Sequence, residues 1–595
     1  MDFLKYYERE LTFTRELAAE FAKKHPKIAA RLLLEPDKCE DPHMERLIEA
    51  FAFECARLHM KIDDDFPEIV EPLLNVVFPH FIRPIPSMSV VRFEPTIATV
   101  PPSGYSIAKN ISLFSKPVND TCCQFTTVYP VTLWPVEVVS TELREPRRLV
   151  KDARQAIVIR LKTCNGLGLD QIGWQTLRFY INGSGKHASH IHELLLNNTC
   201  HMEYVASNSY GKTDSAAIPL DNIQPVGFEH DETMIPSLRK EFPGFLLFFE
   251  YFCFPEKFHF IDFNGLDKFR PKDMDTIELW IYLDRDTKPD LLINKDTFSI
   301  HCTPVINLFD RNAEPIDAKQ AKEEYRIIPY DKKTDAAEIY SIDKVTGTIT
   351  GSSGIDFDPL YSLKHHLHED NGQDRAFWNI QRRYSGRKGD NGTDVFLSFS
   401  GLDLKPAHPT VEQIIVHANC TNRDLPDRLL YGDPAGDLVM EGSAPVRHVN
   451  FVVKPTPTRR PALGGVLQWQ VLSLLKPNYL PLMRGQVESF RAILRLYDFD
   501  NSLVTRRIIN GIHTVQSQHV TRRIGQAFFR GVEVTIGFEE SKYMESGLFM
   551  FTSVLERFLS QFVSSNSFTQ LVTRTSPGGK VFKIWPPRRG GRPLL

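Results

Sequence analysis

Two stretches near the start of the chain repeat apolar residues every three or four positions, and this spacing is the strongest constraint on the fold. The first stretch has Leu4, Tyr7, Leu11, Thr14, Ala18 and Phe21, and the second has Met44, Ile48, Phe51, Cys55, Leu58 and Ile62. Such spacing predicts helices with narrow apolar seams suited to helix bundling. Asp41 before Pro42 predicts the start of the second helix, and Asp65 with Glu68 that of a third. We therefore predict a helical segment over residues 1–86.

Beyond about Ser87 the pattern becomes that of strands separated by Pro, Gly and Asn turns. Ile277, Leu279, Ile281 and Leu283 alternate with polar or aromatic neighbours, which is typical of a β-strand. Further strands are predicted at Ile157–Leu161, Leu177–Ile181, Val395–Phe399 and Val411–His417. This stretch is long enough for two β-rich domains of sandwich or barrel type, which we place at residues 87–290 and 291–453, with the boundary near Asp290.

The sequence Lys-Pro-Thr-Pro-Thr-Arg-Arg-Pro at 454–461 predicts a polyproline-like spacer, within a linker at 454–466. A final mixed domain is predicted at 467–595. It has helical spacing at Val487, Phe490, Leu494 and Tyr497, then strands, then an apolar helix with Leu548, Phe551, Leu555, Phe558 and Phe562. The predicted fold class is therefore α+β and multi-domain, with a helical segment, β-rich middle domains and a mixed C-terminal domain.

Composition limits what such a chain can do. The 595 residues are 42% apolar and 24% charged, which favours a folded chain of several domains. The net charge of −3 provides no overall field for a nucleic acid, so a dedicated nucleic-acid binder is disfavoured. The nine cysteines lack the spacing of zinc sites or disulfide frameworks, which indicates a reducing compartment.

Neither a targeting segment nor a membrane span is predicted. The first residues carry Lys5, Glu8, Arg9 and Glu10 without an apolar core, unlike a secretory signal. The most apolar stretch, 242–254, is shorter than the roughly 20 residues that a transmembrane helix needs. We therefore expect no direct membrane insertion.

Catalytic motifs are missing from the sequence. It contains no phosphate-binding loop, no dinucleotide-binding glycine motif and no nucleophile elbow. Two histidine clusters resemble metal sites, at His187, His190 and His192 and at His365, His366 and His368, but glycine, serine and asparagine neighbours favour solvated loop histidines. The acidic run at 63–65 is interpreted as helix termination rather than a cation site. We therefore assign no catalytic, cofactor-binding or metal-binding residue.

The stretch from Asn501 to Val532 is basic in an otherwise near-neutral chain. It has no Asp or Glu, and it contains Arg506, Arg507, Arg522, Arg523 and Arg530, for a local charge of +5. The pentapeptide Val-Thr-Arg-Arg-Ile occurs at 504–508 and again at 520–524, as if two strands presented paired arginines. A solvated sheet face, docking on an acidic protein surface and a nucleic-acid patch all stay open, in that order.

Phenylalanine is concentrated between Phe242 and Phe263. Nine of the 41 phenylalanines lie in these 22 residues. Phe245, Phe248, Phe249 and Phe252 fit one side of a helix, which favours a core position over a subunit interface.

Together these segments resemble the TssF family, also called ImpG or VasA, of type VI secretion baseplate proteins. The matching stretches in the first third are ERLIEAFAFECARLH, DDDFPE, RPIPSMSVVRF, VTLWPVEV and LRFYING. Further along come EYFCFPEKFHFIDF, CTPVINLF, CTNRDLP, KPTPTRRP, RLYDF, RGVEV, LERFLSQFVSSNSFTQLV and WPPR. They follow one another in order over residues 45–588, nearly the whole chain.

The resemblance implies a structural subunit of the baseplate wedge, without enzymatic activity or cofactor. It implies assembly with a TssG-like subunit and a second copy of this chain, with TssK, TssE and the spike hub nearby. It also implies a cytoplasmic protein recruited to the inner membrane through the secretion apparatus. The helical seam at 44–62 would then join a bundle with the partner, and the four arginines at 506, 507, 522 and 523 would dock a partner.

Two other functions are kept as alternatives. The chain could be a wedge protein of a phage-like contractile particle. It could instead be a β-rich glycan-binding or hydrolase module, for which a deep pocket with two carboxylates about 5 to 10 Å apart would be the evidence. The sequence does not give the copy number, the helix that meets each partner, the change on firing or the effector.

Overall fold

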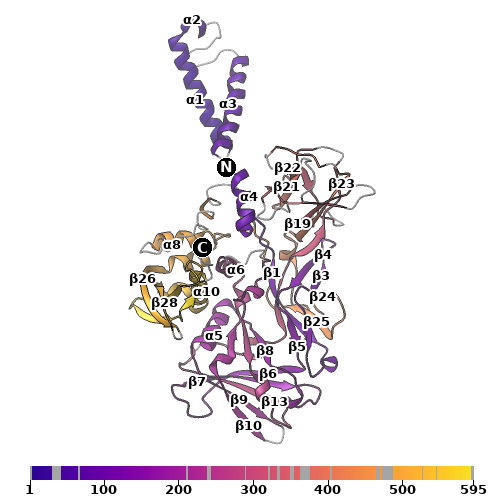
Figure 1. The fold of residues 1–595 in the computed structure, drawn as a ribbon, viewed down its shortest axis with the longest axis vertical. Coiled ribbons are helices and arrows are strands. Elements are labelled where there is room, and N and C mark those ends of the chain that lie inside the picture. The colour runs from indigo at the N-terminus through magenta and orange to yellow at the C-terminus, as the bar shows by residue number, and fades with distance from the viewer. Residues whose placement is uncertain are drawn as a thin grey trace. The chain divides into compact units, whose positions relative to one another are not determined.

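The computed structural model gives the fold of the chain (Figure 1). It describes residues 3–29, 42–63, 67–208, 212–236, 243–288, 290–318, 322–330, 336–348, 354–361, 376–401, 405–409, 411–463, 469–471, 487–524, 527–544 and 546–590. There are two compact units, Met1–Ile82 with Ala462–Leu475 and Arg83–Pro461 with Lys476–Leu595. The predicted α+β, multi-domain class is confirmed, whereas the division at 86, 290, 453 and 466 stays a prediction.

The first compact unit is helical. It contains α1 (Phe3–Lys24), α2 (Pro26–Ala29), α3 (Pro42–Asp63) and α4 (Pro67–Val77), followed by the 3₁₀ turn η2 (Pro79–Phe81). The helix α3 begins at Pro42 as predicted, because a first-turn residue needs no N–H partner. The predicted caps Asp41 and Asp65 lie outside the described residues. Figure 1 shows α1 and α3 side by side.

A closed barrel lies in the second unit. Its strands are β1 (Met88–Pro95), β15 (Cys302–Ile306), β4 (Thr121–Thr127), β3 (Ser112–Val118), β24 (Leu438–Met440) and β25 (Val446–Phe451), in that order around the barrel. Its core includes Phe93, Phe125, Val305 and Phe451. The strands come from both sides of Asp290, so segments far apart in the sequence close one barrel. A small sheet of β2 (Tyr105–Ile107) and β5 (Val131–Leu133) packs on this core.

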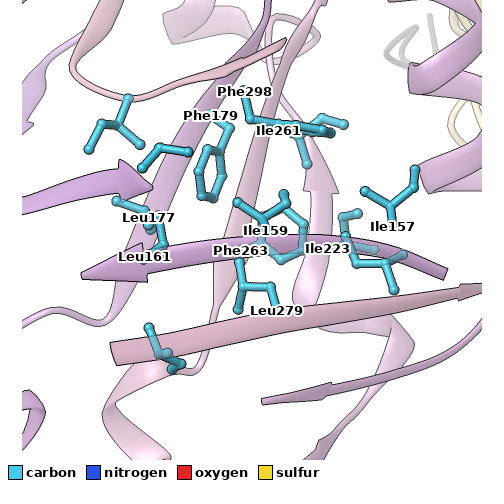
Figure 2. Packing of buried hydrophobic residues seen from close by; sticks show 14 of the residues in the cluster. Ile157, Ile159, Leu161, Leu177, Phe179, Ile223, Ile261, Phe263, Leu279 and Phe298 are labelled. Carbon is cyan, nitrogen blue, oxygen red and sulfur yellow. The ribbon is translucent and has the colours of Figure 1, made fainter. Parts of the chain in front are cut away.

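Two sheets with a shared core form a sandwich between residues 134 and 300. One has the order β10-β9-β13-β7-β6 and the other β11-β12-β8-β14. Their bounds are β6 (Val136–Arg144), β7 (Gln155–Thr163), β8 (Thr176–Ile181), β9 (Thr199–Ser207), β10 (Thr213–Ile218), β11 (Ile223–Pro225), β12 (Phe260–Asn264), β13 (Thr276–Leu283) and β14 (Phe298–Ser299). Figure 2 shows Ile159 and Leu279 from the first sheet near Phe179 and Phe263 from the second. The three strands predicted in this region are confirmed.

A second pair of sheets shares a core between residues 309 and 421. One contains β16 (Phe309–Asn312), β23 (Gln413–Thr421), β19 (Glu338–Thr348) and β20 (Ile355–Phe357), with β17 (Ile316–Asp317) beside β23. The other has the order β18 (Tyr325–Ile327), β22 (Thr393–Ser400) and β21 (Phe377–Tyr384). The strands predicted at Val395–Phe399 and near Val411–His417 are confirmed as β22 and β23.

The C-terminal part combines helices with one sheet. Its elements are α8 (Val487–Arg495), α9 (Leu503–Asn510), β26 (Ile512–Ile524), β27 (Ala527–Glu539), α10 (Leu548–Ser560), β28 (Phe568–Ser576), β29 (Lys580–Ile584) and β30 (Arg588–Arg589). The strand order is β26-β27-β28-β29, with β30 beside β28. The strands β27 and β28 are parallel, and α10 forms the crossover between them.

The phenylalanine-rich segment packs in the core of the second compact unit. It forms α6 (Pro243–Cys253), in which Phe245, Phe248 and Phe249 are buried. The rings of Phe248 and Phe558 of α10 meet edge to face, 4.4 Å between centroids. All five residues of the apolar seam predicted for α10 are buried. Both apolar segments therefore stabilise this chain rather than a subunit interface.

The predicted spacer at 454–461 is held along its length. Thr456 and Met88 of β1 exchange two hydrogen bonds, at 2.9 Å each. Arg459 pairs with Asp500 at 2.6 Å, and Arg460 binds the buried Glu338 of β19 at 2.7 Å. The segment therefore ties the barrel, the second sandwich and the C-terminal part together, and we call residues 454–461 the strap.

Candidate partner interfaces

The α1–α3 hairpin is closed by small side chains. Ala52 and Ala56 of α3 are fully buried, and Cys55 and Ile48 beside them are half-buried. The rings of Phe3 and Phe53 meet at 5.1 Å. Because alanine lets helices approach closely, this face can pack tightly with little large apolar surface. The helix α3 therefore turns an alanine face towards α1, and Phe51 and Leu58 of the predicted seam stay exposed.

Polar contacts flank the hairpin. Arg15 of α1 forms an ion pair with Glu45 of α3. Glu10 is buried and lies 2.8 Å from the His59 ring. Although desolvation acts to raise it, hydrogen bonds with His59 and Arg9 hold the pKa of Glu10 below its ordinary value. These contacts fix the antiparallel pairing of α1 and α3.

The predicted interface residues of α3 divide into three groups. Phe51 and Leu58 are 60% and 62% exposed. Cys55 and Ile48 are half-buried in the hairpin. Met44 and Ile62 lie in α3, but their side chains are outside the described residues. An apolar stripe is thus left exposed on α3, and Leu47, 62% exposed, extends it.

The helix α1 carries a similar exposed stripe, of which the predicted seam includes only Phe21. Phe13, Leu17 and Phe21 are spaced by four residues and are between 39% and 56% exposed. Large apolar side chains exposed together mark an interaction surface. The four-residue spacing of this stripe can be read from the sequence, but the longer apolar seam that begins at Leu4 lies beside it on the same helix and gives the stronger signal. We call the stripes on α1 and α3 the hairpin stripes.

The structure separates the four predicted arginines into two pairs. Arg506 and Arg507 lie on the helix α9, whereas Arg522 and Arg523 lie on the strand β26. The expectation of two strands presenting paired arginines is therefore wrong for the first pair. Ser502 caps α9 by accepting a hydrogen bond from the Val504 N–H at 3.2 Å, which sets the helix start just before the first pentapeptide.

The arginines make local contacts but stay exposed. Arg506 donates to Asn501 at 2.9 Å and lies 3.8 Å from Asp498. Arg522 donates to Glu533 at 2.8 Å and to Gln570 at 3.2 Å. All four predicted arginines keep exposed side chains. The two acidic partners, Asp498 and Glu533, lie just outside the stretch that lacks Asp and Glu. They therefore offset the positive charge only near its two ends.

The first histidine cluster lies on a helix, not on a strand or loop. His187, His190 and His192 belong to α5 (Gly185–Asn197), whose Ala188, Ile191, Leu194 and Leu195 are buried at helical spacing. His192 is fully buried beside Phe549, and burial holds its pKa well below the ordinary value. The second cluster lies outside the described residues. Among the residues that are described, no group of three or more His, Cys, Asp or Glu is placed to hold a metal.

A cavity of about 190 Å³ lies beside α6 and α9 and brings Glu256, Asp498 and Asp500 together. Asp498 accepts the Ser502 N–H at 2.9 Å, and Asp500 pairs with Arg459 of the strap. Burial raises the pKa of Glu256 above its ordinary value. The two aspartates stabilise α9 and the strap, so this cavity does not favour the hydrolase alternative.

The described charged groups lock the chain together, while apolar stripes and arginines stay on the surface. This is the organisation of a structural subunit of a larger assembly. None of the helices in the described part of the chain is both long and apolar enough to cross a membrane.

The chain belongs to the TssF family of the type VI secretion system. The family model described as "Type VI secretion system, TssF" matches residues 1–592. The type VI secretion system component TssF1 of Pseudomonas aeruginosa is 32% identical over 626 aligned residues, which cover 100% of this chain and 99% of the relative. The family consists of structural components of the secretion baseplate.

Two solved structures are similar to this fold. A chain of the TssK-TssF-TssG baseplate subcomplex is 26% identical with a TM-score of 0.75, covering 92% of this chain and 99% of that one. A chain of the baseplate complex from the type VI secretion system is 24% identical with a TM-score of 0.63, covering both chains completely. The second likeness supports the fold alone.

Proposed function

We propose that this chain is a non-enzymatic scaffold of the baseplate wedge, working on the cytoplasmic side of the inner membrane. It joins a TssG-like subunit and a second copy of itself in the wedge, with TssK-like and TssE-like subunits and the spike hub nearby. The related chain in the TssK-TssF-TssG subcomplex supports the TssG-like and TssK-like partners. The observation that carries the proposal for this chain is the pair of exposed hairpin stripes.

Helix geometry supports a shared groove between the two stripes. At 100° per residue, Phe13 and Leu17 lie roughly 100° to one side of the inner face of α1. Phe51 and Leu58 lie roughly 120° in the same sense from the face of Ala52 on α3. Because the helices are antiparallel, equal senses of rotation place both stripes on one side of the hairpin. A third helix lying there would cover both stripes and complete a bundle.

The energy available is sufficient for specific assembly. Fully burying a Phe or Leu side chain contributes about 1.5–3 kcal/mol. Phe51 and Leu58 each keep about three fifths of their surface exposed, so covering both contributes roughly 2–4 kcal/mol. At 1.4 kcal/mol for each factor of ten, this corresponds to about 30- to 700-fold in affinity. Glutamate at these positions would remove this gain and add the cost of burying charge.

The test is co-expression with the neighbouring TssG-like subunit, followed by size-exclusion chromatography with light scattering. The Phe51→Glu/Leu58→Glu variant should lose the complex while its β-rich domains stay folded by circular dichroism. Arg46→Gln/Arg57→Gln changes the net charge by the same −2 on exposed positions away from the stripes, and it should keep the complex. A complex retained by the first variant would refute the bundle assignment.

The basic segment is proposed as a second docking surface for an acidic partner. Arg506, Arg507, Arg522 and Arg523 are exposed in a stretch without acidic residues, which supports this role. Changing all four to Gln should weaken assembly more at low salt than at high salt, since salt screens exposed charges. An unchanged complex at every salt concentration would identify these arginines as a solvated face.

A further inference from the structure

The strand β26 lies at the edge of the C-terminal sheet. It runs for 13 residues, and β27 is its only strand partner among the described residues. Edge strands expose unpaired backbone N–H and C=O groups, and proteins usually protect them with proline, bulges or charge. Here a register shift follows Ile512, Arg491 donates to the Ile512 carbonyl at 2.7 Å, and Arg522 and Arg523 place positive charge at the far end. From Thr514 to Ile524 the edge has no proline and no acidic residue.

The far end of β26 and β27 extends past the rest of the sheet. The pairing of β27 with β28 begins at Gly531, so residues 520–524 and 527–530 form a two-stranded ribbon. Phe528, opposite Arg523 in the ribbon, is 75% exposed. Phe529, on the other face, lies under the Arg589 guanidinium at 5.2 Å. One face of the ribbon tip is therefore covered by the chain itself, and the other exposes an aromatic ring.

The charge around the ribbon is mainly positive, with Glu533 paired to Arg522 at 2.8 Å. Arg522, Arg523 and Arg530 lie on it, Arg589 lies beside it, and the first acidic residue after it is Glu533. Along the edge, Gln516, Gln518 and Thr521 are exposed and can form hydrogen bonds. An added strand would gain backbone hydrogen bonds from the edge and charge-assisted bonds from the arginines.

We propose that the outer edge of β26 from Thr514 to Ile524 binds an extended acidic segment of another subunit as an additional strand. Aspartate or glutamate residues of that segment meet the ribbon arginines, and one apolar side chain covers Phe528. The inference deepens the docking role proposed above for the basic segment and rests on it. It names the geometry, since backbone pairing along an edge differs from side-chain docking on a basic patch.

The test is amide hydrogen exchange, measured on the full chain alone and in its complex with the TssG-like and TssK-like subunits. Strand addition should slow exchange at least tenfold for the outward-facing amides, every second residue between 514 and 524, because the N–H groups that face away from β27 become hydrogen-bonded. The opposite edge of the same sheet, β29, is the internal control and should not change. In the Arg523→Gln/Phe528→Ser/Arg530→Gln variant the complex should persist through the hairpin while the protection of β26 falls.

The outcomes are distinguishable. A complex that forms with β26 unprotected would overturn the strand proposal and leave the bundle intact. Protection already present in the chain alone, and lost on dilution, would assign the edge to a second copy instead. Binding of a fluorescein-labelled oligothymidine of 20 nucleotides that the triple variant abolishes would assign the ribbon to nucleic acid, and it would equally overturn the proposal. Loss of the whole complex in Phe51→Glu/Leu58→Glu tests only the hairpin.

Discussion

A buried ion pair holds the phenylalanine-rich helix in place, and removing half of it is the sharpest test of the fold. Glu250 of α6 and Lys257 of the 3₁₀ turn η7 (Pro255–Phe258) are hydrogen-bonded, and both side chains are fully buried. Glu250 also accepts the Met234 and Ile235 N–H groups at 2.7 and 3.1 Å. The pair therefore joins α6, the turn after it and the loop at 234–235.

The perturbation is Lys257→Met, which keeps the length of the side chain and removes its charge. The Glu250 carboxylate would then be buried with only two backbone donors. Breaking a buried ion pair from one side costs about 3–5 kcal/mol. For a domain of 150–250 residues, each kcal/mol lowers the Tm by roughly 2–4 °C, so we expect a decrease of about 6–20 °C.

The control is Glu250→Gln/Lys257→Met, in which both charges are gone. The Gln carbonyl can still accept the Met234 and Ile235 N–H groups, so the double variant should recover most of the lost stability. The assay is differential scanning calorimetry of the three proteins, with near-ultraviolet circular dichroism to check the packing of the aromatic residues. A Lys257→Met protein within about 2 °C of the parent would refute the reasoning, as would a double variant less stable than the single one.

Three other predictions follow from single features. Burial lowers the pKa of His259 from 6.5 to about 4 and that of His301 from 6.5 to about 3, so both histidines bind protons more weakly in the folded chain than in the unfolded chain. The free energy of unfolding should therefore be largest above about pH 6.5 and should fall as the pH drops towards 4, by about 3 kcal/mol for His259 alone. Calorimetry should show a Tm that decreases as the pH is lowered. Arg460→Lys should lower the thermal stability, because two guanidinium nitrogens of Arg460 bind the buried Glu338 and a lysine cannot reproduce both contacts. Thermal unfolding should show this as a lower Tm. Gly531→Ala should destabilise the C-terminal sheet, since a Cβ at this position would lie 2.5 Å from a backbone oxygen of β28. The variant should therefore unfold at a lower Tm.

Helices and strands followed from local spacing, but the face that α3 turns inward did not. The spacing of Phe51 and Leu58 predicts a seam for a partner, whereas Ala52 and Ala56 form the face towards α1. A hydrophobic pattern records how apolar each face is, whereas packing also depends on how closely two backbones can approach. Phe51 and Leu58 therefore stay exposed on α3, and their role as an interface stays a prediction.

Sequence identity over five residues was a poor guide to structure. The two copies of Val-Thr-Arg-Arg-Ile fold as a helix and as a strand because their neighbours differ. Ser502 caps the first copy, whereas the second copy pairs residue by residue with β27. Tertiary pairing thus overrides local propensity. The barrel shows the same limit, since its strands at 88–127, 302–306 and 438–451 meet only in three dimensions.

The buried charges and the exposed stripes have complementary roles in a scaffold. A scaffold subunit must keep its domains in one arrangement, and non-directional apolar packing permits several arrangements of similar energy. The strap avoids this degeneracy with directional bonds, because Arg459 donates to the Cys253 carbonyl at 3.0 Å and Arg460 donates to Glu338 at 2.7 Å. Each bond can be satisfied in only one geometry, and leaving a buried partner unpaired is costly. The larger unit is held by its own directional contacts and does not require the hairpin stripes for folding, which is compatible with the assembly role proposed for them.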